Sequence, residues 1–216
     1  YSSYSDAVTK KYMNTMLKGK TIAVLGLNNK ATEIAHDDIV ATGGNAELVD
    51  INFDKLDMKN AEAPSTKLIE QLKTSLNTTD EKDIIAKTLA TEWDIKAQSR
   101  PLTEALIKDG VLKMNDLNKF KGVDGVVNTA IDGDKVNTLG IAIAEAFKAA
   151  NKPALCASMF QGNNILAQNG WKKEISSTNM LSTSIGTYTI AAVMTGADEG
   201  LYGTIEGAKA VYPQFK

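Results

Sequence analysis

The first candidate for a binding site is the loop that follows an apolar run near the start of the chain. The stretch GLNNKA starts at Gly26 and carries only the first glycine of the dinucleotide motif G-x-G-x-x-G. Asn28 and Ala31 replace the second and third glycines, and the second lets the backbone approach a pyrophosphate. Asp50 follows at a distance suited to holding a ribose hydroxyl. A plain strand-to-helix turn, capped by Asn28 or Asn29, explains the loop better.

The stretch IDGDKVN has two carboxylates and an asparagine, which are oxygen ligands of the kind that a bound cation requires. A calcium loop also needs a further Asn or Asp, a glycine and a distal Glu at its twelfth position. The twelfth residue from Asp132 is Ile143. We therefore expect Asp132 or Asp134 to cap the helix that follows.

Cys156 and Met159 are the candidate metal ligands, because thiolate and thioether sulfur atoms suit Cu(I). Residues three apart in a strand point to opposite faces, so these two could share a metal only if the strand ended between them. We expect a buried cysteine and methionine of the core. His36, the only histidine, lies beside Asp37 and Asp38 on a predicted helix, where we expect it to be solvated.

The composition excludes several classes of site. A net charge of −2 gives no basic surface for nucleic acid. One cysteine and one histidine permit neither an intramolecular disulfide nor the usual Cys/His zinc site. The sequence has no G-x-S-x-G motif and no obvious pair of acid and base, so it identifies no catalytic set. It favours a binding role over catalysis.

Apolar runs alternate with helical patterns along the chain, which predicts an α/β fold. We expect a Rossmann-like, open, mostly parallel sheet with helices on both faces and a helical insertion after the second strand. The predicted strands are 21–27, 45–52, 123–131, 153–159 and a short polar one at 174–181. The predicted helices are one that ends at Gly43–Gly44, three in the insertion at 64–77, 80–97 and 101–110, then 134–152, 163–171 and 184–197, the last of which could also be a strand.

One domain, residues 19–216, accounts for this pattern, with the insertion at about 64–118. Pro64 and Pro101 mark helix starts in the insertion, and Asp80 or the threonine before it should cap the middle helix.

Residues 1–18 carry a helical stripe that Gly19 ends. Its main members are Tyr4, Val8, Tyr12 and Met16. The end of an N-terminal stalk or coiled coil and a first helix packed on the domain both fit this stripe.

The carboxyl ends of the predicted strands are the expected ligand-binding edge, because ligands of doubly wound sheets bind there. Four residues follow these ends and are the candidates: Asn28, Asn29, Asp132 and Gly162.

The C-terminal stretch LYGTIEGAKAVYP is predicted to fold back over the sheet as a clasp. Its glycines allow the chain to reverse after the last helix. We expect Tyr202 to be buried, with its hydroxyl bonded. The residues of the predicted clasp are Gly200, Tyr202, Gly203, Gly207 and Pro213.

Both ends of the chain resemble one family. Residues 177–213 contain a Ser/Thr-Asn segment, an alanine- and valine-rich helix, the G-x-YG motif that starts at Gly200, and a final Pro213. Residues 17–48 contain a Gly-Lys lead-in, a first βα unit and a glycine pair. These features resemble the MctB-type copper transporter family, and the likeness is weak through residues 55–120.

The resemblance implies an N-terminal tail, one membrane helix, a coiled coil and a Rossmann-like domain outside the cytoplasm. The anchor would lie upstream of Tyr1. The implied role is copper homeostasis or export, or envelope assembly. The chain departs from a copper protein, because it has one cysteine, one histidine and no methionine cluster.

Two functions remain open on these grounds. The first is a non-catalytic, extracytoplasmic envelope domain that binds a protein partner or self-associates through its N-terminal helix. The alternative is a small-molecule or nucleotide-binding protein, or an enzyme, that uses the carboxyl edge of the sheet.

Overall fold

The computed structural model describes residues 11–27, 29–52, 54–55, 60–132 and 135–214. The strands of its main sheet are β1 (Thr21–Gly26), β2 (Asn45–Ile51), β3 (Leu112–Met114), β4 (Gly125–Asn128), β7 (Ala154–Met159), β8 (Ser176–Leu181) and β9 (Leu201–Tyr202). The helices are α2 (Lys30–Ala41), α4 (Pro64–Leu76), α5 (Glu81–Glu92), α6 (Pro101–Lys108), the 3-10 helix η1 (Leu117–Phe120), α7 (Thr138–Ala149), α8 (Ile165–Lys172) and α9 (Ser184–Met194). A second, two-stranded sheet pairs β5 (Ile131–Asp132) with β6 (Lys135–Val136).

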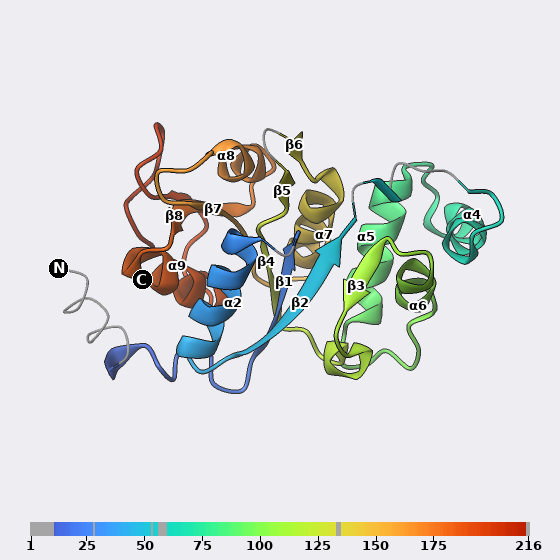
Figure 1. The fold of residues 1–216 in the computed structure, drawn as a ribbon, viewed down its shortest axis with the longest axis horizontal. Helices are drawn as coiled ribbons and strands as arrows, with labels where there is room; N and C mark the ends of the chain where they lie inside the picture. Colours follow the sequence, from blue (N-terminus) through green and yellow to red (C-terminus); the bar gives the residue numbers. More distant parts are fainter. Residues whose placement is uncertain (1–10, 28, 53, 56–59, 133–134, 215–216) are drawn as a thin grey trace.

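The main sheet has the strand order β3-β2-β1-β4-β7-β8-β9. Its neighbours are parallel except β2 and β3, which are antiparallel. The chain winds outwards from β1 in one direction and from β4 in the other, so these two strands flank the point where the order reverses (Figure 1). The predicted Rossmann-like fold class is confirmed.

Helices cover both faces of this sheet (Figure 1). On one face, α2 and α9 pack against strand residues such as Val24 and Leu155. On the other, α5, α7 and α8 pack against residues such as Leu25 and Cys156. Val24 and Leu25 are consecutive but belong to different clusters, because successive side chains of a strand point to opposite faces. Burial on both faces explains why the central strands are continuous apolar runs.

The helix starts follow the local chemistry of the sequence. Asn29 caps α2, where its side chain accepts a hydrogen bond from the Thr32 backbone. Asp80 caps α5 in the same way. Pro64 and Pro101 each occupy the first turn of a helix, where the missing backbone N–H costs nothing.

The region after β4 differs from the prediction. The strand predicted at 123–131 covers only Gly125–Asn128, and the chain then turns into the β5–β6 hairpin. The next helix starts at Thr138, and its cap is Asn137 instead of Asp132 or Asp134. The physical reason is that Asn137 Oδ1 accepts hydrogen bonds from the Leu139 and Gly140 backbone. Residue 134 and the side chain of Asp132 lie outside the described part of the chain.

The insertion is helical as expected, but it also supplies a strand. β3 pairs with the end of β2 and extends the sheet at that edge. Trp93 fixes the insertion to the core, because it is fully buried and packs against Phe120 and Phe147 at ring-centroid distances of 5.1 and 6.1 Å. Its indole Nε1 donates to Thr103 Oγ1 of α6 at 3.1 Å.

The C-terminal segment closes the opposite edge of the sheet. β9 pairs in parallel with β8, so the clasp includes a short strand that the sequence did not predict. Tyr202 is 1% exposed, which confirms the predicted burial, and its hydroxyl donates to the Asp198 carbonyl oxygen. Gly203 has φ +122°, and a Cβ there would lie 2.0 Å from Asn179 Oδ1, so only glycine fits.

The other clasp residues also occupy defined places. A Cβ on Gly200 would meet the Tyr202 ring at 2.9 Å, so glycine permits the close turn into β9. Gly207 has φ +82°, and Pro213 is buried near the end of the segment.

The N-terminal segment is fixed to the domain at its end. Met13 and Leu17 are buried, and the Leu17 backbone N–H donates to the Thr42 carbonyl at 2.9 Å. Residues 1–10 lie outside the described part of the chain, so the stalk stays a prediction. Within the described ranges, no helix has the length and apolar character needed to cross a membrane.

Asp38 makes a polar contact between α2 and α9. Its Oδ1 accepts a 2.8 Å hydrogen bond from Thr187 Oγ1, and its Oδ2 is buried without a hydrogen-bond partner among the described residues. Burial raises the pKa of this carboxyl from 3.8 to about 6; the Thr187 hydrogen bond opposes the increase and Asp37 adds to it. Between about pH 4 and pH 6 the folded protein therefore keeps a proton that the unfolded chain has already lost.

We expect Asp38→Asn to stabilise the fold at pH 7 by about 3 kcal/mol, which is the equivalent of a pKa raised by about two units. Because the folded-state pKa is the higher one, wild-type stability should fall as the pH rises from about 4 to about 6. Asp38→Asn should lose this decrease. Urea unfolding across that pH range measures it, with Glu33→Gln, an exposed acid on the same helix, as the control. Parallel pH profiles for Asp38→Asn and wild type would contradict the prediction.

Candidate functional site

The turn from β1 into α2 lies at the reversal point of the sheet, where a doubly wound fold presents its ligand site. Gly26 is required there, because a Cβ would lie 2.1 Å from Thr32 Oγ1. Thr32 Oγ1 also lies 3.0 Å from Thr129 Oγ1, just beyond β4, which in turn donates to the Leu25 carbonyl at 3.0 Å. These contacts join the ends of β1 and β4 through the protein's own side chains.

The first turn of α2 is also occupied by a side chain of the protein itself. Asn29 Oδ1 accepts from both the backbone N–H and the hydroxyl of Thr32, at 3.2 and 3.1 Å. A phosphate bound at this helix start would have to displace that cap. The geometry therefore supports the predicted strand-to-helix turn over a pyrophosphate site.

The predicted edge residues follow the strands as expected but do not form one constellation. Asn29 follows β1, Asp132 is in the hairpin after β4, and Gly162 follows β7, where its N–H donates to the Met159 carbonyl at 3.0 Å. Asn28 lies outside the described residues. No hydrogen bond in the described part of the chain joins Asn29 to Gly162.

Asp50 is placed at the end of β2, directly opposite Gly26 of β1 in the parallel register. It lines a hollow of about 440 Å³, which we call the Asp50 hollow. The hollow lies between the ends of β1 and β2, β3 and the end of α6. Its lining residues are Leu27, Asp50, Ile51, Asn52, Ile107, Gly110, Leu112, Lys113 and Met114.

Cys156 and Met159 both belong to β7, which runs through Met159 without ending between them. Cys156 packs in the cluster under α5, α7 and α8, whereas Met159 packs against the cluster under α2 and α9. Burial raises the pKa of the Cys156 thiol to about 12. The structure therefore does not bring these two sulfur atoms to one site. In the described ranges, no cluster of three or more His, Cys, Asp or Glu side chains is placed to hold a metal ion.

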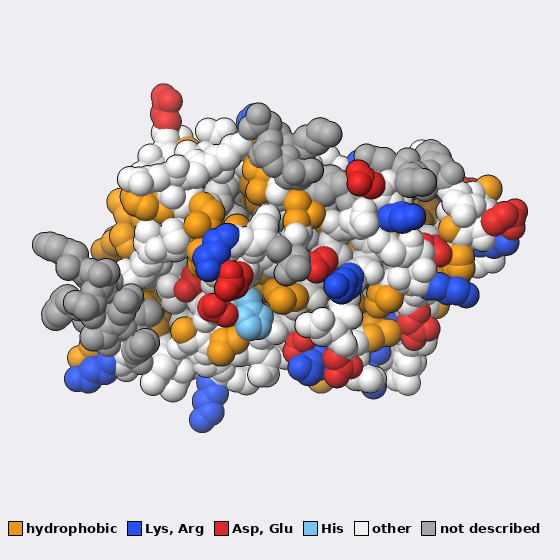
Figure 2. All heavy atoms as spheres, in the orientation of Figure 1, with side chains coloured by type: hydrophobic (Ala, Val, Ile, Leu, Met, Phe, Trp, Pro, Cys, Tyr) orange, Lys and Arg blue, Asp and Glu red, His pale blue; other side chains and the backbone are white. Residues whose placement is uncertain are grey.

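His36 lies on α2, where its Nδ1 is 3.0 Å from Asp37 Oδ1. Figure 2 shows the histidine at the surface of this face, beside acidic side chains. Its side chain is partly exposed, as the sequence predicts. It is remote from Cys156, which is buried under the opposite face of the sheet.

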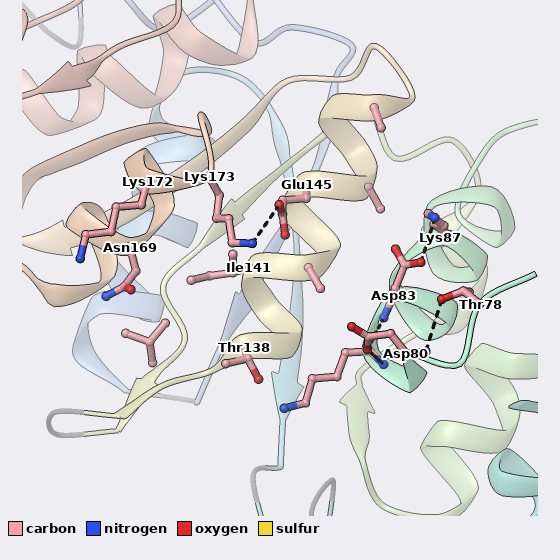
Figure 3. A pocket seen from close by; sticks show the side chains of 15 residues that line it. Thr78, Asp80, Asp83, Lys87, Thr138, Ile141, Glu145, Asn169, Lys172 and Lys173 are labelled. Carbon is pink, nitrogen blue, oxygen red and sulfur yellow. Dashed lines mark hydrogen bonds and ion pairs between the residues drawn. The ribbon is translucent and has the colours of Figure 1, made fainter.

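A larger surface feature lies along α7, between α5 and α8 (Figure 3). One hollow there has a volume of about 700 Å³, and a second of about 490 Å³ shares Lys87, Ala146 and Ala149 with it. We call the two adjoining hollows the α5–α7 groove. α7 lines the groove from Thr138 to Ala149, which is the full 12-residue helix and about 18 Å in length.

The floor of the α5–α7 groove is made of small and apolar side chains. They are Ala90, Ala97, Val136, Ile141, Ala142, Ala146, Ala149 and Ala150. Alanine side chains let another backbone approach closely, because interhelical distance depends on side-chain size at the contact. The groove therefore has the length and the floor to receive about three turns of a helix.

The rim of the groove is charged, and its lining residues include five lysines and four carboxylates. Two pairs among these lining residues neutralise one another, Lys87 with Asp83 and Lys173 with Glu145, the latter visible in Figure 3. Asp94 pairs with Lys152, which lies outside the lining of the groove. Asp80 is engaged as the α5 cap. Lys82, Lys96 and Lys172 have no carboxylate within 4.0 Å among the described residues.

The sequence did not predict this groove. Its only local signal is the spacing of Ala142, Ala146 and Ala149, which places three small side chains on one face of α7. The other wall, α5, comes from an insertion more than 40 residues earlier in the chain. That these two helices would pack together could not be read from either one alone.

No family model, curated protein or solved structure matches the chain. Its function must therefore be inferred from the geometry and charge of the Asp50 hollow and the α5–α7 groove.

Proposed function

We propose that this chain is a non-catalytic, extracytoplasmic domain of a membrane-anchored cell-envelope protein, and that it acts by binding a protein partner. The α5–α7 groove is the observation that carries the proposal. It combines an apolar floor, the length of a short helix and a rim with unpaired lysines among the described residues. An amphipathic helix with acidic flanks complements these three properties.

The chemistry of the reactive side chains supports a binding role. Cys156 is the only thiol, and its buried, high-pKa state makes it a poor nucleophile. At the reversal point, the ends of β1 and β4 are joined by the contact between the Thr32 and Thr129 hydroxyls.

The location and the wider role rest on the resemblance of residues 17–48 and 177–213 to the MctB-type copper transporter family. Copper homeostasis or export, or envelope assembly, would then depend on the partner and the anchor. Self-association through the N-terminal helix is compatible with partner binding, because the groove lies on the face opposite α2 and α9. The full-length gene product should sediment with membranes, and recovery in the soluble fraction would contradict the anchored layout.

Site-specific photo-crosslinking in the cells that make the protein tests the groove. A benzophenone amino acid at Ala149, which lines both hollows, should yield a discrete protein adduct. The same amino acid at Val40, an exposed position on α2, is the matched control and should not. Identical adducts from both positions, or none from Ala149, would contradict the proposal.

Charge reversal of the rim tests the expected acidity of the partner. Lys82→Glu combined with Lys172→Glu should reduce the Ala149 adduct at least tenfold. Lys113→Glu, an exposed lysine outside the groove, should leave it unchanged. An adduct that survives the double reversal would show that the unpaired lysines do not select the partner.

A further inference from the structure

The contact between α2 and α9 joins two helices that hold the two terminal segments of the chain. Figure 1 shows them side by side on one face of the sheet. Thr42, the cap at the end of α2, accepts the Leu17 backbone N–H and so holds the N-terminal segment. Tyr188 of α9 touches Tyr212 of the C-terminal segment edge-on, at a ring-centroid distance of 5.9 Å. A change in the α2–α9 contact can therefore reach both segments.

One polar pair interrupts this otherwise apolar contact. Asp38 Oδ1 accepts from Thr187 Oγ1 at 2.8 Å, while Asp38 Oδ2 is buried without a hydrogen-bond partner among the described residues. Thr187 Oγ1 also lies 3.3 Å from the Thr183 carbonyl oxygen of its own helix. If the helices separate, the threonine hydroxyl keeps an acceptor and both oxygen atoms of Asp38 gain water. Only the closed contact leaves a polar atom unsatisfied.

The charges around Asp38 do not compensate an ionised carboxylate. α9 carries no charged side chain, and the strands beneath contribute apolar residues such as Val24 and Leu155. On α2 itself, Asp37 adds repulsion, and His36 bonds to Asp37. In the described part of the chain, no lysine or arginine nitrogen lies within 4.0 Å of the Asp38 carboxylate. The closed contact therefore favours the neutral acid.

Separation of the two helices would return Asp38 to water and so change its proton affinity. Burial raises the pKa of this carboxyl from 3.8 to about 6 in the closed contact, whereas a hydrated carboxyl keeps its ordinary value. Because the closed state has the higher pKa, it is favoured fully in acid and loses this advantage as the pH rises from about 4 to about 6. A difference of about two pKa units raises the population of the open state up to about 100-fold.

We propose that Asp38 and Thr187 form a pH-sensitive latch, which holds α2 against α9 in acid and opens more often at neutral pH. The moving part is the helix contact, and the main sheet stays intact, which separates this local opening from global unfolding. The latch lies on the face of the sheet opposite the α5–α7 groove, so either proposal can fail without the other.

Hydrogen exchange of the native protein, corrected for the intrinsic rate at each pH, tests the latch. The amides of α2 and α9 should lose protection at least twentyfold between pH 4 and pH 7. This exchange should respond little to urea below about 1 M, because separating two helices exposes much less surface than unfolding. Equal protection at the two pH values would overturn the proposal. So would exchange in α2 and α9 that rises with urea as steeply as exchange in β4.

Two variants assign the effect to the polar pair. Asp38→Asn cannot ionise, so its α2 and α9 amides should be equally protected at pH 4 and pH 7. Thr187→Val removes the hydrogen bond that lowers the pKa of Asp38, so its loss of protection should extend to higher pH than in wild type. Glu33→Gln, an exposed acid on α2, is the matched control and should keep the wild-type profile. A wild-type profile in Asp38→Asn or in Thr187→Val would show that this pair is not the latch.

Discussion

Replacing Tyr202 by alanine should reduce the free energy of unfolding by about 3–5 kcal/mol, the cost of deleting a large, fully buried aromatic side chain. The ring is 1% exposed and packs in the cluster beneath α2 and α9. Its removal leaves a cavity in this cluster that the short β9 strand cannot close by moving, because backbone hydrogen bonds hold the strand on both sides.

Two further variants separate the ring from the hydroxyl. Tyr202→Phe keeps the ring and loses only the bond to the Asp198 carbonyl, so it should cost about 1 kcal/mol. Tyr212→Ala removes the same side chain ten residues later, where it is 47% exposed and touches Tyr188 edge-on, and should cost about 1 kcal/mol or less. Urea unfolding followed by circular dichroism measures all three. A loss below 1 kcal/mol for Tyr202→Ala would mean that the C-terminal segment is not a structural clasp.

The C-terminal clasp shows which features of the fold can be predicted from single residues and which cannot. Glycines and an amphipathic ring indicated a chain that reverses and buries Tyr202, and both are features of single residues. That Leu201–Tyr202 would also pair in parallel with β8 is a property of two segments. A strand of two residues has no periodicity of its own from which to predict it.

The elements that were predicted correctly depend on local sequence, whereas those that were missed depend on a second segment. The central strands and the caps Asn29 and Asp80 were predictable, because continuous apolar runs and capping side chains act locally. β3 was missed because three residues, Leu112–Met114, form a strand only where β2 offers an edge. The Asn137 cap was missed because two aspartates earlier in the same stretch fit the capping rule equally well, and the β5–β6 hairpin decided between them.

The candidate sites also combine features that the sequence predicts with features that depend on distant segments. Asp50 could be placed from the sequence, because parallel register carries the end of β2 to the end of β1. The wall of its hollow could not, since Ile107 and Met114 belong to the insertion and the strand that the sequence did not predict. The α5–α7 groove depends wholly on a packing contact between distant helices, and was therefore outside the reach of sequence patterns.

Glu92 should be the most sensitive polar residue of the insertion. Its carboxylate is 6% exposed and accepts hydrogen bonds from the Leu102 backbone, the Thr103 backbone and the Thr103 hydroxyl, at 2.8, 2.8 and 2.6 Å. The last residue of α5 thereby caps α6, whose own N-cap, Arg100, makes no side-chain cap bond. Thr103 also accepts from the Trp93 indole, so the capping network extends to the aromatic core.

We therefore expect Glu92→Ala to lower the free energy of unfolding by about 3–5 kcal/mol, because it leaves several buried donors without an acceptor. Glu92→Gln should lose less: one amide oxygen still accepts, but the NH₂ group faces a donor N–H. Glu104→Ala on the exposed face of α6 is the control and should cost about 0.5 kcal/mol. Urea unfolding gives the three values, and hydrogen exchange of the first turn of α6 locates the effect. If Glu92→Ala and Glu104→Ala were equally mild, α6 would be held by its apolar face alone, and the link from α5 through Thr103 to Trp93 would not stabilise the insertion.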